Sequence, residues 1–369
     1  LADGGLTPVT SLRLDVAGAE LTYDGPSGFS DDTSVFFTAR SFDFGNVFEL
    51  IDQEDIGTPE VTDIILKTTT DLGDRNELEF LFIHAPEKFT RDLKNVAASE
   101  DFEDVSLIRS EQDLSLFGAT WRRMVGSAGE WTNRLYLRSS DKDSAQGEAF
   151  PDLAAAGAPA STIPAREDIF AIQEQEQEIG WRSDFSTFNR FGEFSAGLRV
   201  VNLDAEYETS LDGPWIRYVY ETDDPRPEGQ KFIVWLPETI ESSFSRRGTN
   251  VAAYAEQVFE LASFDFRPGL RVDRDAFSEE TYVSPRFSAG YAATPNLGFS
   301  LTTGVFYESP RFLVRAADPD NFDLANEKIS HVSVGLDYDF AESWNLITEV
   351  YYQQLDDLVV DDGRANNRA

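Results

Sequence analysis

Hydrophobic and polar residues alternate along much of the chain, most regularly in its second half. Between residues 331 and 340 valine, leucine, tyrosine and phenylalanine occupy every second position, and His, Ser, Gly or Asp fills each position between them. Residues 297–307 show the same alternation with two interruptions, at residues 303 and 306. Because successive side chains of a β-strand point to opposite faces, this period predicts strands with one apolar and one polar face.

The same split recurs at residues 179–185, 194–200, 264–273 and 344–353. Extended over the whole chain, it predicts roughly 14 strands of about 9 to 18 residues, longer than the 5 to 6 residues usual in soluble sheets. Some strands are joined by short turns, and others by long polar segments. The short turns are 126–129, 189–192, 294–296 and 341–343, and the long segments are 139–166, 204–245 and 309–328.

This asymmetry of connections favours an all-β fold, an antiparallel up-and-down transmembrane β-barrel of the bacterial outer-membrane kind. Aromatic residues at the ends of the apolar faces suit either the headgroup level of a membrane or the core of a soluble sheet. A soluble β-sandwich is therefore the alternative, although it does not require short turns on one side and long loops on the other.

Composition narrows the function. The 369 residues carry 67 Asp and Glu against 31 Lys and Arg, a net charge of −36, which argues against a nucleic-acid partner held by a basic field. The sequence has no cysteine and two histidines, so thiol catalysis, cysteine-ligated zinc and histidine-rich metal sites are excluded. No apolar run is long enough for a spanning helix, and any crossing must use strands.

Charged residues on the polar faces are the candidate binding residues, because they share those faces with glycine and serine, as in a wet barrel lumen. The arginines among them could bind anionic groups of a metal chelate. The alternative is that these arginines pair with lumen carboxylates or with a plug domain. We favour this alternative. The lumen-facing candidates are Arg199, Arg267, Arg271, Asp273, Arg286, His331, Asp337 and Glu349.

Several short motifs resemble the barrel of TonB-dependent receptors. Residues 23–26 (YDGP) followed by 33–41 are similar to the first barrel hairpin of that family. The other matching segments are VAAYAEQV (251–258), RPGLRVD (267–273), SPR (284–286), GVFYESP (304–310) and EVYYQQLDDL (349–358).

The resemblance implies an N-terminal plug followed by a 22-stranded barrel in the outer membrane of a Gram-negative bacterium. Residues 1–369 then form a partial barrel domain with about 14 of the 22 strands. No plug is evident, so we expect an internal fragment. It also implies uptake of a scarce solute such as a ferric siderophore or a cobalamin. The implied partners are this small-molecule or metal-chelate ligand, outer-membrane lipid, and a TonB-type energy-coupling protein acting through the plug.

Catalytic motifs are not found: the sequence has no Walker A loop, no G-x-G-x-x-G and no G-x-S-x-G. We therefore expect no enzyme, no catalytic residue, no cofactor and no metal site. Residues 318–323 have oxygen ligands at calcium-like spacing but lack the glycine and distal glutamate of an EF-hand. The alternative function is a secreted or surface β-rich binding protein without transport activity, and a passive porin is a weaker one.

Overall fold

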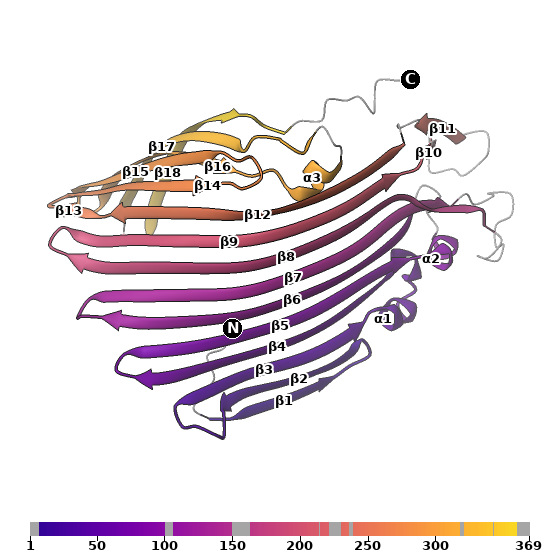
Figure 1. Ribbon diagram of the computed structural model, residues 1–369, viewed down its shortest axis with the longest axis horizontal. Coiled ribbons are helices and arrows are strands. Elements are labelled where there is room, and N and C mark those ends of the chain that lie inside the picture. The colour runs from indigo at the N-terminus through magenta and orange to yellow at the C-terminus, as the bar shows by residue number, and fades with distance from the viewer. Residues whose placement is uncertain are drawn as a thin grey trace.

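The computed structural model describes residues 7–99, 106–149, 163–213, 215–220, 230–235, 239–317, 321–341 and 343–359. Most of these residues lie in antiparallel strands (Figure 1). The strands are β1 (Val9–Leu14), β2 (Gly18–Pro26), β3 (Thr33–Asp43), β4 (Thr58–Gly73), β5 (Asn76–Arg91), β6 (Ser106–Val125), β7 (Gly129–Ala149), β8 (Ala165–Asn189), β9 (Gly192–Leu211), β10 (Trp215–Tyr220), β11 (Gln230–Trp235), β12 (Ile240–Gln257), β13 (Phe259–Leu261), β14 (Phe264–Arg274), β15 (Thr281–Thr294), β16 (Leu297–Glu308), β17 (Glu327–Ala341) and β18 (Trp344–Asp356).

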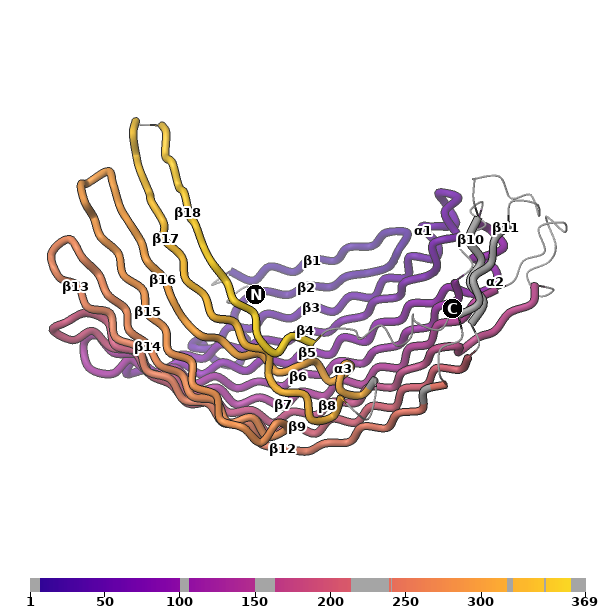
Figure 2. The backbone as a smooth tube through the Cα atoms, turned by 90° about the horizontal axis from the view of Figure 1, so that it is seen from above, coloured from indigo at the N-terminus to yellow at the C-terminus, as the bar shows by residue number. Residues whose placement is uncertain are grey.

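The topology is up-and-down. In the described part of the chain one sheet holds 16 strands, and each strand pairs with its neighbour in sequence, except that β12 pairs with β9 because the β10–β11 hairpin forms a separate sheet. The short β13 pairs with β14 beside this path. Figure 2 shows the sheet curled into a deep trough, with β1 and β18 at its two edges. The expected barrel architecture is confirmed, and the expectation of about 14 strands is slightly too low.

The two ends of the sheet differ in their connections. At one end short turns join the strands, for example from Gly73 to Asn76 and from Asn189 to Gly192. At the other end the connections are mostly longer and carry every short helix described: α1 (Gly45–Leu50), η1 (Glu54–Ile56), α2 (Leu93–Ala98) and α3 (Phe312–Ala317). The predicted asymmetry is confirmed.

Strands extend into two of the predicted long loops. β7 continues to Ala149 and β8 resumes at Ala165, while β9 runs to Leu211 and β12 starts at Ile240. β8 has 25 residues. At about 3.3 Å per residue such a strand spans roughly 80 Å, whereas a bilayer needs only about 9 to 11 residues. Strands of this length would extend beyond a bilayer, where both faces are wet, and their polar composition there is typical of loops.

The outer, convex face of the sheet carries a continuous apolar band near the short turns. Cross-strand partners share a face, and the register aligns Phe82 with Phe117, Phe117 with Leu137, and Leu137 with Ile179. The band continues around the sheet, and its exposed members include Leu66, Phe82, Phe117, Leu137, Ile179, Leu198, Val251, Leu270, Val283, Phe299, Leu301, Val334 and Val350. A soluble protein rarely exposes a patch of this size, whereas a barrel presents such a band to lipid.

The strands nearest the C-terminus test the predicted alternation directly. The face of this band includes Val332, Leu336, Leu346 and Val350. Leu336 pairs with Phe299 of β16, and Val332 lies four residues before Leu336 on the same strand. On β18, Val350 pairs with Val334 and Leu346 lies four residues before Val350. A sandwich would cover this face with a second large sheet. In the part of the chain that the structure describes, the second sheet is the two-stranded β10–β11 hairpin.

The inner, concave face is mostly polar and carries one buried cluster near the helix-bearing end. There α3 packs against β9 and β12, and Figure 2 shows α3 inside the curve of the sheet. The cluster joins Tyr207 and Phe244, which are register partners, to Ala316 of α3. None of the described helices is long and apolar enough to cross a membrane.

Candidate functional site

The register places all eight lumen-facing candidates on the concave face. Arg199 pairs with Ala252, and Ala252 also pairs with Asp273. Arg199 lies eight residues from Tyr207 on the same strand, so its side chain points to the side on which α3 packs. The same alternation, followed through successive pairs, brings Arg267, Arg271, Arg286, His331, Asp337 and Glu349 to this face.

Four of the eight candidates line one hollow in the concave wall, with a volume of about 370 Å³. They come from three strands, Arg199 from β9, Arg271 and Asp273 from β14, and Arg286 from β15. Ser309 and Asn326, from the two ends of the connection between β16 and β17, also line the hollow. The wall between β9 and β16 therefore concentrates guanidinium groups around one cavity.

The guanidinium groups in this hollow are not equally available. Arg271 is held by Asp273 of the same strand, with its Nε 2.8 Å from Oδ2 and its Nη2 2.6 Å from Oδ1. Arg286 stacks over the ring of Phe306 at 4.9 Å. In the described part of the chain neither Arg199 nor Arg286 forms an ion pair with a carboxylate, and the Arg199 side chain hydrogen-bonds with the Tyr136 side chain. These two arginines retain donors that an anionic group could use.

The other four candidates lie outside the hollow. Arg267 forms an ion pair with Glu256, with 3.7 Å between Nε and Oε1. His331 stacks on Tyr351 with 6.2 Å between ring centroids, and Asp337 accepts a hydrogen bond of 2.6 Å from the Asn345 side chain. Glu349 lies on edge strand β18, paired in register with Gly335. The interpretation favoured from the sequence was pairing with lumen carboxylates or with a plug. Arg267 and Arg271 have carboxylate partners on the wall, and pairing of Arg199 or Arg286 with a plug stays a prediction.

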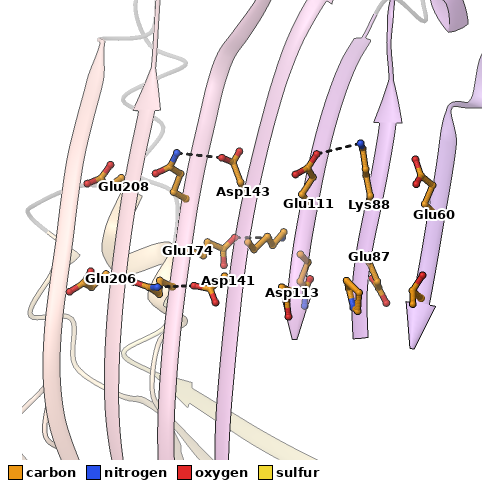
Figure 3. A pocket seen from close by; sticks show the side chains of 16 residues that line it. Glu60, Glu87, Lys88, Glu111, Asp113, Asp141, Asp143, Glu174, Glu206 and Glu208 are labelled. Carbon is orange, nitrogen blue, oxygen red and sulfur yellow. Dashed lines mark hydrogen bonds and ion pairs between the residues drawn. The ribbon is translucent and has the colours of Figure 1, made fainter. Parts of the chain in front are cut away.

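A second, larger hollow of about 750 Å³ lies on the convex face (Figure 3). Twelve of its 16 lining residues share the face of the apolar band by register and lie on its helix-bearing side. Lys88 pairs with Glu111 at 3.6 Å, and Gln175 donates a hydrogen bond of 2.8 Å to Asp141. The described residues contain no group of His, Asp and Glu arranged to hold a metal ion. Residues 318–320 of the calcium-like stretch lie outside the described residues.

Comparison with known proteins identifies the family. The family model described as "TonB dependent receptor-like, beta-barrel" matches residues 67–369. The chain belongs to this family. It is a family of receptors and not of enzymes. No curated protein matches the chain by sequence.

Solved structures of this family share the fold. The ferric-catecholate import receptor Fiu from Escherichia coli K12 is 11% identical, with a TM-score of 0.63, and the match covers 96% of this chain and 59% of Fiu. A mutant of the ferric enterobactin receptor PfeA from Pseudomonas aeruginosa is 12% identical, with a TM-score of 0.56 over 94% of this chain and 52% of PfeA. The E. coli outer-membrane transporter YddB is 10% identical, with a TM-score of 0.57 over 91% of this chain and 46% of YddB. This receptor barrel therefore spans about half the length of the structures that it matches.

Residues that the sequence analysis did not select complete the inner wall of this receptor barrel. Arg134, Arg182 and Arg199 are direct register partners on β7, β8 and β9, a contact between like charges that costs stability unless it is compensated. Asp184 supplies the compensation, with one carboxylate oxygen 3.0 Å from Arg134 and 2.7 Å from Arg182. Tyr254 donates a further hydrogen bond of 2.9 Å to this carboxylate. The alternation of residues 131–138 would have revealed Arg134, but its register with Arg182 is a property of the folded sheet.

Proposed function

We propose that this receptor barrel is part of an outer-membrane transporter of a Gram-negative bacterium that takes up a scarce, anionic metal chelate. The observation that carries the proposal is the family match over residues 67–369, combined with an apolar outer band and a polar inner wall. A ferric siderophore is favoured over a cobalamin for two reasons. Fiu and PfeA are named as receptors for ferric catecholate and ferric enterobactin, and Arg199 and Arg286 line the hollow without a carboxylate partner among the described residues.

Strands β1 and β18 lie at the two edges of the sheet, and each has one side without a neighbouring strand among the described residues. Unpaired backbone groups in hydrocarbon cost several kcal/mol each, so a sheet with exposed edges does not cross a bilayer alone. We infer that further strands of the full-length protein pair with β1 and β18 and close the wall. Outer-membrane lipid then contacts the apolar band, and a TonB-type protein acts on a plug inside the barrel.

Uptake by cells tests the transport proposal. The full-length receptor is expressed in a Gram-negative host that lacks its own ferric-siderophore receptors, and uptake of radioactive iron is measured with a panel of ferric siderophores. We expect saturable uptake of at least one of them, and its loss in a host without the TonB protein. Uptake that persists without TonB would indicate a passive porin, and no uptake of any ferric siderophore would reject the proposed substrate class.

Matched variants locate the ligand contact. Arg199→Ala and Arg286→Ala each remove a guanidinium without a carboxylate partner, and we expect the concentration for half-maximal uptake to rise about tenfold or more, since a charge-assisted hydrogen bond contributes about 1.5–3 kcal/mol. Arg267→Ala is the control, because this arginine lies outside the hollow and pairs with Glu256. Equal effects of all three substitutions would show that the hollow has no special role in binding.

A further inference from the structure

The ring of Tyr136 lies over a strand position that has no side chain. Tyr136 of β7 pairs in register with Gly180 of β8. A Cβ at residue 180 would lie 2.1 Å from Cε1 of the Tyr136 ring, far closer than the contact distance of two carbon atoms. Glycine weakens the interior of a strand, and it is found where another group approaches the backbone closely. Gly180 therefore allows the Tyr136 side chain to reach across β8 toward β9.

The Tyr136 hydroxyl lies between a cation and an anion of the inner-wall hollow. It donates a hydrogen bond of 3.0 Å to Oε2 of Glu178. Arg199 also hydrogen-bonds with the Tyr136 side chain, and since a guanidinium only donates, the phenol oxygen is the acceptor. Both Arg199 and Glu178 line the hollow. One neutral oxygen atom therefore bridges these two charged groups.

Glu178 keeps an excess of negative charge although it has an arginine partner. Nη1 of Arg138 lies 3.2 Å from Oε1 of Glu178, and the same atom lies 2.7 Å from Oε2 of Glu176. One guanidinium thus serves two carboxylates, which leaves one negative charge in excess. Opposite charges attract more strongly in a partly buried wall than in water. Without the intervening hydroxyl, Glu178 would therefore attract Arg199.

A second tyrosine has the same arrangement beside a different arginine. Tyr254 of β12 pairs in register with Gly197 of β9, where a Cβ would lie 2.4 Å from Cε1 of the ring. The Tyr254 hydroxyl donates a hydrogen bond to Asp184, and Arg182 contacts this carboxylate directly at 2.7 Å. Asp184 therefore neutralises Arg182 with or without the hydroxyl. Tyr254 is the matched comparison for Tyr136.

We propose that Tyr136 is a positioning residue, whose hydroxyl directs the Arg199 guanidinium at the hollow and keeps Glu178 from neutralising it. A neutral acceptor fixes the direction of the guanidinium and leaves its positive charge for an anionic group of the ligand. The inference rests on the proposed function for the contact between Arg199 and the ligand. It adds the residue that keeps this arginine available.

A structure of the full-length Tyr136→Phe receptor tests the inference without any ligand. Phenylalanine keeps the ring over Gly180 and removes only the hydroxyl. We expect Arg199 and Glu178 to form a direct ion pair in this variant, with nitrogen and oxygen within about 4 Å of each other. The inference is overturned if the two groups remain apart, because the hydroxyl then has no part in separating them.

Uptake of radioactive ferric enterobactin, an anionic tris-catecholate complex, measures the consequence in cells that express the full-length receptor. We expect Tyr136→Phe to raise the concentration for half-maximal uptake about tenfold at an unchanged maximal rate, because a neutralised Arg199 loses its charge-assisted hydrogen bond to the ligand. Tyr254→Phe should change neither quantity. Adding Glu178→Gln to Tyr136→Phe should restore the wild-type concentration, since glutamine carries no charge that neutralises Arg199. Such a rescue is not expected if the phenol only supports the packing of the wall.

The outcomes separate this inference from the proposed function. If Arg199→Ala weakens uptake but Tyr136→Phe does not, or if Glu178→Gln fails to restore uptake, the inference is wrong and the proposed function stands. If Arg199→Ala leaves uptake unchanged, the proposed ligand contact fails. Absence of uptake by the wild type counts against ferric enterobactin as the substrate, and the structure of Tyr136→Phe then decides the inference alone.

Discussion

The assignment of the two faces of the sheet makes a sharp prediction for two neighbouring residues of β16. Leu301 points outward in the apolar band, where its register partners are Ala289 and Val334. Thr302 follows it on the same strand and points inward, and both side chains are exposed. An arginine at position 301 would face lipid, and an arginine at position 302 would face the wet lumen.

The depth of Leu301 sets the size of the effect. It lies four residues after Leu297, the first residue of β16 at the short-turn end. With about 3.4 Å per residue and a strand tilt of about 40°, this distance corresponds to roughly 10 Å along the membrane normal, near the middle of an apolar band about 25 Å tall. An arginine facing lipid at that depth costs about 2–4 kcal/mol, which lowers the folded-to-unfolded ratio roughly 30- to 1,000-fold.

Folding of the full-length receptor into lipid vesicles measures this cost. We expect Leu301→Arg to lower the guanidinium midpoint of unfolding, and Thr302→Arg to leave the midpoint within the range of about 0.5 kcal/mol typical of exposed substitutions. The same pair can be compared in detergent, where the difference should shrink because detergent adapts to the charge. If Thr302→Arg were as costly as Leu301→Arg, or if Leu301→Arg were neutral, the assignment of the faces would be refuted.

Further predictions concern the wall near α3 and two turns. The pKa of Tyr207, which lies beyond the apolar band, is raised by burial and by its 2.5 Å hydrogen bond to Glu176, so its phenol contributes stability below pH 10 that is lost as the pH rises further. In an ultraviolet pH titration, the difference between the wild type and Tyr207→Phe should show no tyrosine that ionises near pH 10. Above that pH, the free energy of unfolding of Tyr207→Phe should fall less than that of the wild type. Gly192→Ala should destabilise the fold by more than about 1 kcal/mol in chemical unfolding, since φ is 136° and a Cβ would lie 2.5 Å from the Val258 carbonyl oxygen. At Gly28 φ is 75° and the surrounding space is open, so Gly28→Ala should lower the free energy of unfolding only by the backbone strain of about 1 kcal/mol. Equal losses of stability at both sites would show that the contact with the Val258 carbonyl has no role.

The sequence predicted the strands best where they cross the apolar band. In β14 and β16–β18 one face belongs to the apolar band and the other is mostly polar, so hydrophobicity alternates and the register partners lie on the predicted faces. Beyond the band both faces are wet, and this contrast disappears. Segment 139–149 is therefore strand in the structure although its composition is that of a loop.

The inner-wall hollow was predictable only in part. Alternation is sufficient to place Arg199 and Arg271 on polar faces, but their approach depends on β12 lying between β9 and β14 and on its register with both strands. The position of α3 is harder still to foresee. A segment of six residues between β16 and β17 carries no local signal that it packs on strands β9 and β12.

Cysteine scanning of β17 in the full-length receptor, in intact outer membranes, tests most directly whether this sheet is a membrane wall with its arginines inside. Single cysteines at residues 332, 334, 336, 338 and 340 should respond to a lipid-soluble quencher, and those at 331, 333, 335, 337 and 339 should react with a water-soluble maleimide. A clear alternation of the two responses is the expected result. Equal responses at odd and even positions, or lipid contact at His331 and Asp337, would contradict the proposed wall.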